Sequence, residues 1–161
     1  MGKVAFVFPG QGAQYPGMGK SLHDTSPAAA SVFRLVDSIR PGTSDQCFFG
    51  SDEEMKETRI TQPCIWAVEM AAAAALTESG IHADMTAGFS LGELSALSYA
   101  GVVDASTCFK LVCERGRLMQ DAAEAVETSM AAVVKLPNET VEEICARFDG
   151  VYPVNYNCPV R

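Results

Sequence analysis

The sequence predicts an α/β fold in which helices connect the strands of a parallel sheet, and three observations support this prediction. Residues 3–8 and 84–89 are two short strand-like segments, and patterns typical of helices lie between them and after the second. Strands separated by helices favour parallel pairing through crossover connections. The 161 residues suffice for one domain with a real core, or for one domain and part of another.

The first strand is expected over residues 3–8, where a continuous apolar run is typical of a strand buried on both faces. Helices are expected further on because apolar residues recur at helical spacing, Pro63 suits a first turn, and Gly80 suits a helix end. The expected helices cover residues 27–40, 53–57, 61–80, 91–100 and 105–124.

The pattern changes beyond about residue 127. Residues 130–136 and 151–157 are predicted strands, and Asn138 is expected to cap a helix over residues 141–148. A compact β-α-β unit of this kind forms half of a ferredoxin-like subdomain. The expected division of the chain is residues 1–126, with the larger parallel sheet, and residues 127–161, with the partial ferredoxin-like subdomain.

Composition and charge exclude several classes of partner. Twelve Lys and Arg against 20 Asp and Glu give a formal charge of −8 without any basic tract, so we expect no nucleic-acid partner. An acidic surface disfavours anionic membranes, and no apolar run approaches the roughly 20 residues of a spanning helix. The six cysteines show neither a CxxC pair nor zinc-like spacing with histidine. We therefore predict reduced cysteines in a cytoplasmic protein, without a bound metal and without a membrane partner.

The most informative motif is Gly88-Phe89-Ser90-Leu91-Gly92, a G-x-S-x-G between a predicted strand and a predicted helix. A serine at such a tight turn is held in strained backbone geometry, and the flanking glycines make room for it. The Leu91 amide at the helix N-terminus can then stabilise an oxyanion. The alternative is a serine that only caps the helix, but a cap does not require glycine on both sides. We therefore predict that Ser90 is the nucleophile of an acyl-transfer site.

The second informative residue is Arg115, in the helix expected over residues 105–124. Charged residues follow one face of that helix, and Arg115 falls on the opposite, apolar face between Leu111 and Leu118. Arginine stays charged when buried and needs an anionic partner there, and its forked guanidinium matches a carboxylate. From the residues alone, that partner is either the carboxylate of an acidic acyl group or an Asp or Glu of the protein.

Four motifs follow one another along the chain, and together they resemble a known family. They are Phe8-Pro9-Gly10-Gln11-Gly12, Thr61-Gln62-Pro63, Gly88-Phe89-Ser90-Leu91-Gly92-Glu93 and Arg115-Gly116-Arg117-Leu118-Met119-Gln120. This set is similar to the N-terminal half of the bacterial malonyl-CoA:acyl-carrier-protein transacylases, whose pattern the acyltransferase domains of fatty-acid and polyketide synthases share. The resemblance covers the whole chain, including Pro153-Val154-Asn155-Tyr156-Asn157. It implies an α/β-hydrolase-like large subdomain and a ferredoxin-like small one.

The resemblance also implies roles for individual residues. Ser90 would attack the malonyl thioester, the main-chain amides of Gln11 and Leu91 would form the oxyanion hole, and Arg115 would pair with the malonyl carboxylate. Gln62 matches a position that lines the active site. The implied reaction is ping-pong: malonyl passes from coenzyme A to the serine and then to the phosphopantetheine thiol of acyl carrier protein, with no permanently bound cofactor. The preference between malonyl and methylmalonyl stays open.

Two departures from the family pattern matter. Phe89 stands where the family usually has a histidine beside the serine, a change that we expect to be tolerated. The family's catalytic histidine would fall beyond Arg161, and neither His23 nor His82 matches its position. We therefore interpret the chain as an N-terminal portion of the enzyme that lacks the general base.

Two other functions remain open at this point. A serine esterase or thioesterase would deliver the acyl group to water, although a neutral acyl chain would leave the Arg115 cation unpaired. A non-catalytic module derived from the transferase is favoured by the missing histidine and disfavoured by the intact Gln11, Ser90 and Arg115.

Overall fold

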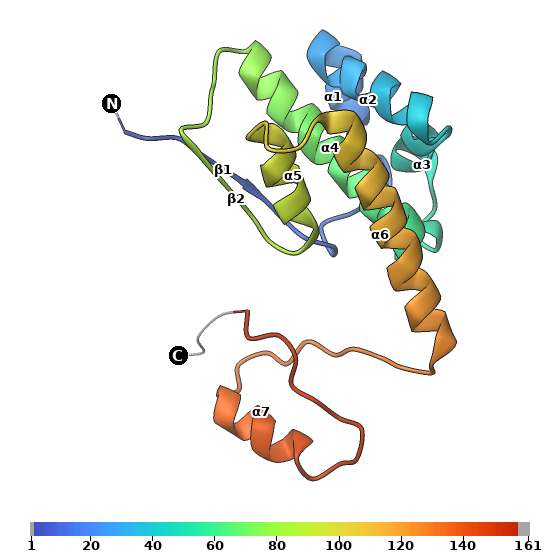
Figure 1. Cartoon of the computed structure of the whole chain (residues 1–161), viewed down its shortest axis with the longest axis vertical. Helices are drawn as coiled ribbons and strands as arrows, with labels where there is room; N and C mark the ends of the chain where they lie inside the picture. Colours follow the sequence, from blue (N-terminus) through green and yellow to red (C-terminus); the bar gives the residue numbers. More distant parts are fainter. Residues whose placement is uncertain (1, 158–161) are drawn as a thin grey trace. The chain divides into compact units, whose positions relative to one another are not determined.

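The computed structural model describes residues 2–157, and the chain divides into two units, Met1–Val126 and Glu127–Arg161 (Figure 1). The first unit is α/β, as predicted, and contains two strands, with helices between them and after the second. Its elements are β1 (Ala5–Phe8), α1 (Lys20–Thr25), α2 (Pro27–Ile39), α3 (Thr43–Phe49), the 3₁₀ helix η1 (Glu54–Lys56), α4 (Thr58–Glu78), β2 (Met85–Gly88), α5 (Leu91–Tyr99) and α6 (Ala105–Ala125).

The sheet of the first unit consists of β1 and β2, which pair in parallel with Ala5 opposite Met85 and Phe8 opposite Gly88. This confirms the parallel pairing expected from the sequence. The expectation that β1 is buried on both faces was wrong, because Phe6 and Phe8 are buried whereas the side chain between them, Val7, is 73% exposed. Only one face of β1 is covered within the described residues, and there Phe6 and Phe8 pack against a tyrosine of α5.

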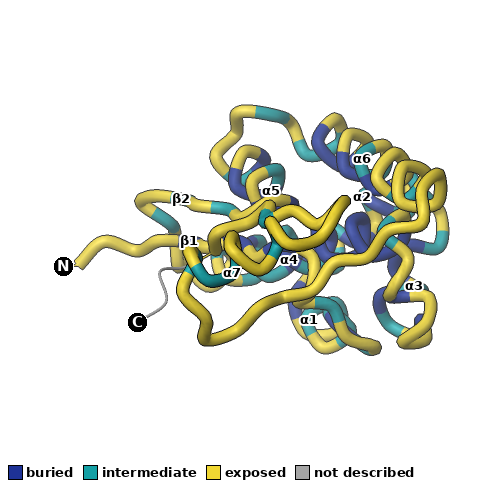
Figure 2. Tube along the Cα trace, turned by 90° about the horizontal axis from the view of Figure 1, so that it is seen from below, coloured by how far each residue is buried: buried dark blue, intermediate teal, exposed yellow. Residues whose placement is uncertain are grey.

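Helix α4 is the centre of the core, and it contacts α2, α3, α5 and α6. Buried residues are concentrated along α4 and on the neighbouring helices (Figure 2). Trp66 of α4 is fully buried and lies 5.3 Å from the ring of Phe109 of α6. Large aromatic side chains of this kind dominate the stabilisation of a core. The packing therefore fixes α4 and α6, the two helices that carry Gln62 and Arg115, against each other.

In the first unit, the helix boundaries agree with the sequence prediction except at three places. Helix α4 begins at Thr58, one turn before the expected start, so Pro63 lies within the helix and not in its first turn. Helices α1 and α3 were not expected at all. Both are short, with six and seven residues, and a segment of that length carries too few turns for a clear periodic pattern.

The second unit contains one helix, α7 (Asn138–Cys145), and its described residues form no strand. The strands predicted over residues 130–136 and 151–157 were therefore wrong. Those segments have the apolar content of strands, but a strand also needs a partner for its main-chain groups, and the described residues of this unit supply none. Helix α7 covers Asn138–Cys145 and not the expected residues 141–148, and Asn138 lies inside it and does not cap it, because the N-cap residue is Pro137.

The cysteines of the described part are free. Cys47, Cys64 and Cys108 are buried, and Cys113 and Cys145 are partly buried. The sixth, Cys158, lies outside the described residues. Of the helices that the structure describes, none combines the length and the apolar character needed to cross a membrane.

Candidate active site

Ser90 sits at the tight turn between β2 and α5. Its backbone has φ 51° and ψ −105°, a conformation that residues other than glycine rarely adopt. Such strain persists only where the surrounding structure imposes it, and it is concentrated at functional sites. The side chain is exposed, so its hydroxyl is accessible from solvent. The strand–turn–helix geometry predicted from the G-x-S-x-G motif is present.

The two glycines of the motif are required by contacts of the main chain. A Cβ atom at Gly88 would lie 2.1 Å from the carbonyl oxygen of Gly92, and one at Gly92 would lie 2.1 Å from the carbonyl oxygen of Phe8. Real Cβ atoms do not approach backbone oxygens so closely. The end of β1, the end of β2 and the first turn of α5 therefore meet at a point where no side chain fits.

The Ser90 hydroxyl does not cap α5. No hydrogen bond runs from its side chain to the amides of that helix. Its Oγ instead accepts a hydrogen bond of 3.0 Å from Nη2 of Arg115, a residue of α6. The interpretation of Ser90 as a simple helix cap is thus not supported by its contacts.

Arg115 is half-buried, and both side chains that accept hydrogen bonds from it are neutral. Besides Ser90, its guanidinium donates from Nη1 to Oε1 of Gln62 at 2.8 Å. Within residues 2–157, no carboxylate lies within ion-pair distance of this guanidinium. The second alternative from the sequence, an internal ion pair to Asp or Glu, is therefore absent from the described part. The cation remains available for an anion supplied from outside.

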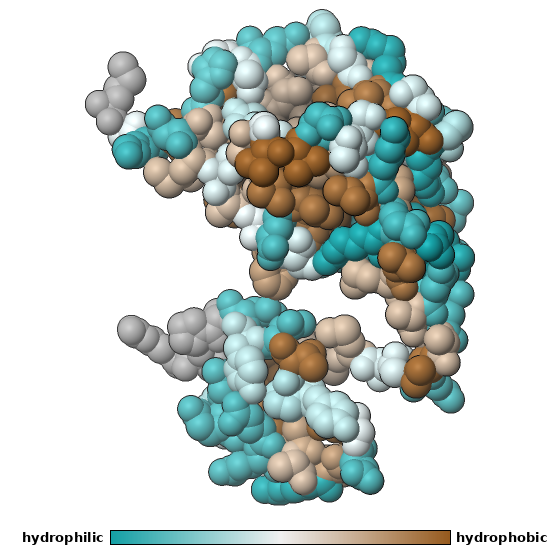
Figure 3. Space-filling model, in the orientation of Figure 1, coloured by the Kyte–Doolittle hydropathy of each residue, from teal (hydrophilic) through white to brown (hydrophobic). Residues whose placement is uncertain are grey.

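The surroundings of Arg115 differ from the predicted apolar stripe. The buried residues of α6 are Cys108, Phe109, Val112 and Gly116. Leu111 and Leu118 are about half exposed, and apolar side chains are visible on the face formed by α5 and α6 (Figure 3). The predicted position of the apolar face was wrong. It was inferred as the side opposite the charged residues, but the side of α6 that is buried is the side in contact with α4.

Gln62 joins the parts of the site. It lies in α4, is fully buried, and holds Arg115 through its Oε1 atom. Its Nε2 atom donates to Sδ of Met119 at 3.2 Å and to Oε1 of Gln11 at 3.5 Å. A buried amide with its donors and its acceptor engaged is fixed in orientation. The structure thus brings together Ser90, Arg115, Gln62 and Gln11, four of the five residues that the sequence singled out, through direct side-chain contacts.

The loop after β1 lies directly against the serine. A Cβ atom at Gly10 would be 2.9 Å from the carbonyl oxygen of Phe89 and 3.5 Å from Cβ of Ser90. The next residue, Gln11, is exposed, and Leu91 on the other side of the serine is buried. In the part of the chain that the structure describes, the main-chain amides of Gln11 and Leu91 donate no hydrogen bond to the protein. Neither N–H is thus used as a donor by the described part of the fold, and Leu91 itself is fully buried.

Neither histidine reaches the serine. His23 lies in α1, where its ring packs against Phe33 and Phe48 and its Nδ1 atom is 3.1 Å from Asp24. His82 lies in the exposed loop before β2. Among the described residues, neither histidine contacts Ser90.

Glu69, which belongs to none of the four sequence motifs, is a buried carboxyl group between α4 and α5. Its Oε2 atom accepts a hydrogen bond from the Ser95 hydroxyl, and its Oε1 atom has no partner among the described residues. Burial raises the pKa of Glu69 to about 7, and the hydrogen bond from Ser95 opposes this shift only in part. The group is therefore largely neutral in mildly acidic solution, and it connects α4 to the helix that begins beside Ser90.

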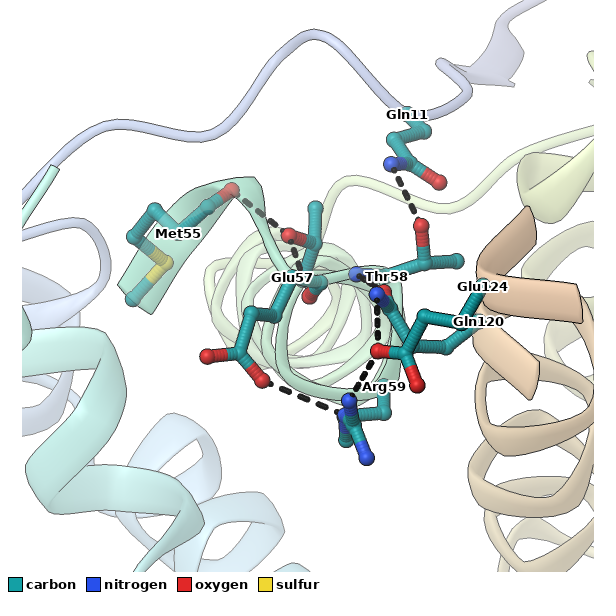
Figure 4. Close-up of polar contacts among 8 residues, drawn as sticks. Gln11, Met55, Glu57, Thr58, Arg59, Gln120 and Glu124 are labelled. Carbon is teal, nitrogen blue, oxygen red and sulfur yellow. Dashed lines mark hydrogen bonds and ion pairs between the residues drawn. The ribbon is translucent and has the colours of Figure 1, made fainter. Parts of the chain in front are cut away.

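Thr58 and Gln120 are two further residues around the site that sequence reasoning missed as site residues. Thr58 Oγ1 accepts a hydrogen bond of 3.3 Å from Nε2 of Gln11, and the Thr58 amide donates to Oε1 of Gln120 at 2.7 Å (Figure 4). Gln120 is the last residue of the fourth motif, which is the signal that could have identified it. No set of three or more His, Cys, Asp and Glu side chains suited to a metal ion occurs in residues 2–157.

Comparison with known proteins gives one consistent result. The family described as acyl transferase domain matches residues 5–161. A malonyl CoA-acyl carrier protein transacylase of Bacillus subtilis (strain 168) is 38% identical over 164 residues, which cover 99% of this chain and 52% of that protein.

Solved structures give the same result. The crystal structure of MCAT from Streptococcus pneumoniae matches with a TM-score of 0.86 and 38% identity, over 98% of this chain and 53% of that one. A complex of a type II PKS acyl-carrier protein with its malonyl-transacylase matches with a TM-score of 0.84 and 34% identity, over 98% and 53%. The chain thus spans about half the length of the relatives that it matches. With the acyl transferase match extending over nearly all of its residues, the chain belongs to the acyl transferase domain family.

Proposed function

We propose that this chain carries the acyl-accepting serine of a malonyl-CoA:acyl-carrier-protein transacylase. The observation that carries the proposal is the hydrogen bond of 3.0 Å between Arg115 and Oγ of Ser90, which places a cation without a carboxylate partner beside a strained nucleophile. The names of the relatives supply the substrate class, since the Bacillus subtilis protein is a malonyl CoA-acyl carrier protein transacylase. A malonyl thioester carries a carboxylate a short distance from its reacting carbonyl, which suits this arrangement.

In the proposed first step, Oγ of Ser90 attacks the thioester carbonyl of malonyl-CoA. The carbonyl oxygen becomes an oxyanion, which the main-chain amides of Gln11 and Leu91 would bind. The bond from carbon to sulfur then breaks, coenzyme A leaves as a thiol after taking up the serine proton, and malonyl remains on Ser90 as an ester. In the second step the phosphopantetheine thiol of acyl carrier protein attacks this ester, malonyl passes to its sulfur as a thioester, and the thiol proton returns to Oγ of Ser90.

Arg115 would bind the malonyl carboxylate in both steps. Its guanidinium can meet a carboxylate with two parallel hydrogen bonds. Nη1 is already held by Gln62, so the bound carboxylate would take the place of Ser90 at Nη2. The exchange would also free Oγ from a donor that lowers its nucleophilicity. Binding of the correct acyl group and activation of the serine would thereby be linked.

The general base is the part of the mechanism for which the described residues offer no candidate. Neither His23 nor His82 contacts Ser90, and loss of general base catalysis typically lowers a rate by about 10²–10⁴-fold. We therefore propose that this chain by itself is acylated slowly.

We propose that residues 1–126 are part of an α/β-hydrolase-like subdomain and residues 127–161 part of a ferredoxin-like one. The strained serine between β2 and α5 supports the first assignment. The second rests on the family resemblance alone, because α7 is the one regular element among that unit's described residues. A cytoplasmic location, malonyl-CoA and acyl carrier protein as partners, and the absence of a permanent cofactor belong to the same proposal.

The test is to incubate the chain with malonyl-CoA and to record its intact mass, with Ser90→Ala as the control. A malonyl adduct on the unchanged chain that is absent from Ser90→Ala is the expected result. Release of free malonate without a carrier thiol would indicate a thioesterase instead. No adduct from a chain shown to be folded by circular dichroism would contradict catalysis by this chain alone and favour a non-catalytic module.

A further inference from the structure

Two of the hydrogen-bonded pairs that connect α4 to α6 are called together the α4–α6 clamp. One is the pair of Thr58 and Gln120, in which the Thr58 amide donates to Oε1 of Gln120 at 2.7 Å. The other is the pair of Gln62 and Arg115, in which Nη1 donates to Oε1 at 2.8 Å. The proposed function uses the pair of Gln62 and Arg115 directly. It gives no role to the pair of Thr58 and Gln120.

The pair of Thr58 and Gln120 caps α4. The first amides of a helix have no acceptor within the helix, and an adjacent side chain usually supplies one. An acceptor oxygen usually comes from the side chain of the N-cap residue. Here the N-cap residue is Glu57, and its side chain makes no such hydrogen bond. Gln120 of α6 supplies that acceptor instead. A tertiary contact therefore satisfies the first amide of α4.

The orientation of the Gln120 amide is fixed from its other side. Its Nε2 atom donates to Oε1 of Glu124 at 2.8 Å, and the same carboxylate also pairs with Arg59 (Figure 4). The amide nitrogen must face a carboxylate and the amide oxygen must face an N–H, so the network defines which end points to Thr58.

The two helices approach each other closely between the two pairs. A Cβ atom at Gly116 would lie 3.0 Å from the carbonyl oxygen of Thr58 and 3.5 Å from Cβ of Gln62. Gly116 follows Arg115 directly and precedes Gln120 by four residues. The absent side chain allows the backbones to pack together at this point, so a small shift at one pair is transmitted to the other.

Gln11 closes the network on the side of the loop. Its Nε2 atom donates to Oγ1 of Thr58 at 3.3 Å, and its Oε1 atom accepts from Nε2 of Gln62 at 3.5 Å. The side chain of Gln11 therefore rests on the same two residues of α4 that take part in the clamp. The position of the Gln11 main-chain amide beside Ser90 depends on both.

We infer that Gln120 is a positioning residue for the acyl-transfer site: by capping α4 at Thr58, it sets where Gln11 and Gln62 lie relative to Arg115. The effect of Gln120 on acylation rests on the proposed function. Its effect on the positions of Gln11 and Gln62 does not depend on any reaction. Gln120 touches neither Ser90 nor a substrate in this arrangement. Its effect is exerted through Thr58 and the start of α4.

The first experiment needs no substrate. In the full chain, the side-chain amide signals of Gln11 and Gln62 and the Nε–H signal of Arg115 are recorded by ¹H–¹⁵N NMR. We expect Gln120→Ala to move these signals, because it removes the acceptor of the Thr58 amide. Unchanged signals in Gln120→Ala would overturn the inference.

Asp104→Ala is the matched control. Asp104 caps α6 through the Thr107 amide at 2.9 Å, and it lies at the opposite end of that helix from Gln120. Both substitutions remove one helix cap, so both are expected to lower thermal stability by similar amounts. Only Gln120→Ala is expected to move the site signals. An equal movement in Asp104→Ala would show that the effect is general loss of stability, and would also overturn the inference.

The second experiment measures the consequence for acylation. Initial rates of adduct formation at Ser90 are compared for malonyl-CoA and acetyl-CoA at a temperature where every variant is folded. A misplaced Arg115 should reduce the malonyl-to-acetyl preference by about 5- to 100-fold in Gln120→Ala, with Asp104→Ala unchanged. A preference that Gln120→Ala leaves intact would overturn the inference. If the unchanged chain forms no adduct, the proposed function fails for this chain, and the NMR comparison still decides the role of Gln120.

Discussion

At the scale of single residues, the site is defined by where side chains are absent as much as by where they are present. Ser90 adopts a positive φ that only its surroundings can maintain. Gly88 and Gly92 allow the two strand ends and the first turn of α5 to meet around it. The predicted role of the two glycines, to make room around the serine, follows from sterics, because any side chain at either position would collide with the main chain.

Gly92→Ala is expected to destabilise the fold strongly. Its Cβ atom would overlap the carbonyl oxygen of Phe8 at 2.1 Å, so β1 and α5 would have to separate. We expect a loss of more than about 3 kcal/mol in the free energy of unfolding, measured by urea titration. Gly80→Ala is the control, because Gly80 has φ 82° but open space around it and should cost only about 1–2 kcal/mol. A Gly92→Ala variant no less stable than Gly80→Ala would contradict the steric argument.

Arg115→Lys tests whether the fork of the guanidinium matters beyond its charge. Lysine keeps the cation but cannot hold Gln62 and a carboxylate in one plane. We expect the malonyl-to-acetyl preference of Ser90 acylation to fall by about tenfold or more, measured by intact mass against time. The matched control is Arg117→Lys, since Arg117 is exposed and pairs with Glu114 and Asp121 on the outer face of α6. Equal effects of the two substitutions would argue against a specific role for Arg115.

At the scale of elements, the sequence predicted the parallel pairing and the positions of α2, α5 and α6 because each depends on local patterns. It did not predict the start of α4, because the cap comes from Gln120, 62 residues away. It placed the apolar face of α6 wrongly, because burial on that helix is decided by contact with α4 and not by the distribution of charge. The tight turn at Ser90 could be predicted from the sequence, because five consecutive residues encode it. The hydrogen-bond network through Thr58 could not be predicted, because its residues come from three separate segments of the chain.

The contact of α4 with α5 should make stability depend on pH through Glu69. Its pKa is about 7 in the folded protein and near 4.5 when unfolded, so folding favours the protonated form. The stabilisation is complete below about pH 4.5 and is lost as the pH rises through 7; the upper limit is about 3 kcal/mol. Glu69→Gln, which stays neutral, should remove this part of the pH dependence in urea titrations between pH 5 and 8. A slope that is identical in the variant would show that Glu69 is not its source.

At the scale of the whole molecule, the two units differ in what stabilises them. The first buries a continuous set of apolar side chains around α4, including Trp66, Phe33 and Phe109. In the second, no described residue is buried, and α7 is its one regular element in that part of the chain. Because apolar burial is the main source of stability, cooperative unfolding should be a property of the first unit.

Hydrogen exchange on the full chain tests this difference. Amides in the middle of α4, such as those of Ile65 to Ala71, should exchange only through global unfolding, because they are hydrogen-bonded within a helix whose side chains are buried. Amides of residues 130–136 and 151–157 should exchange far faster, since they form no strand and lie exposed. Mass spectrometry of peptides from the quenched chain distinguishes the two classes. Protection at residues 130–136 comparable to that of α4 would mean that this segment pairs as a strand in solution.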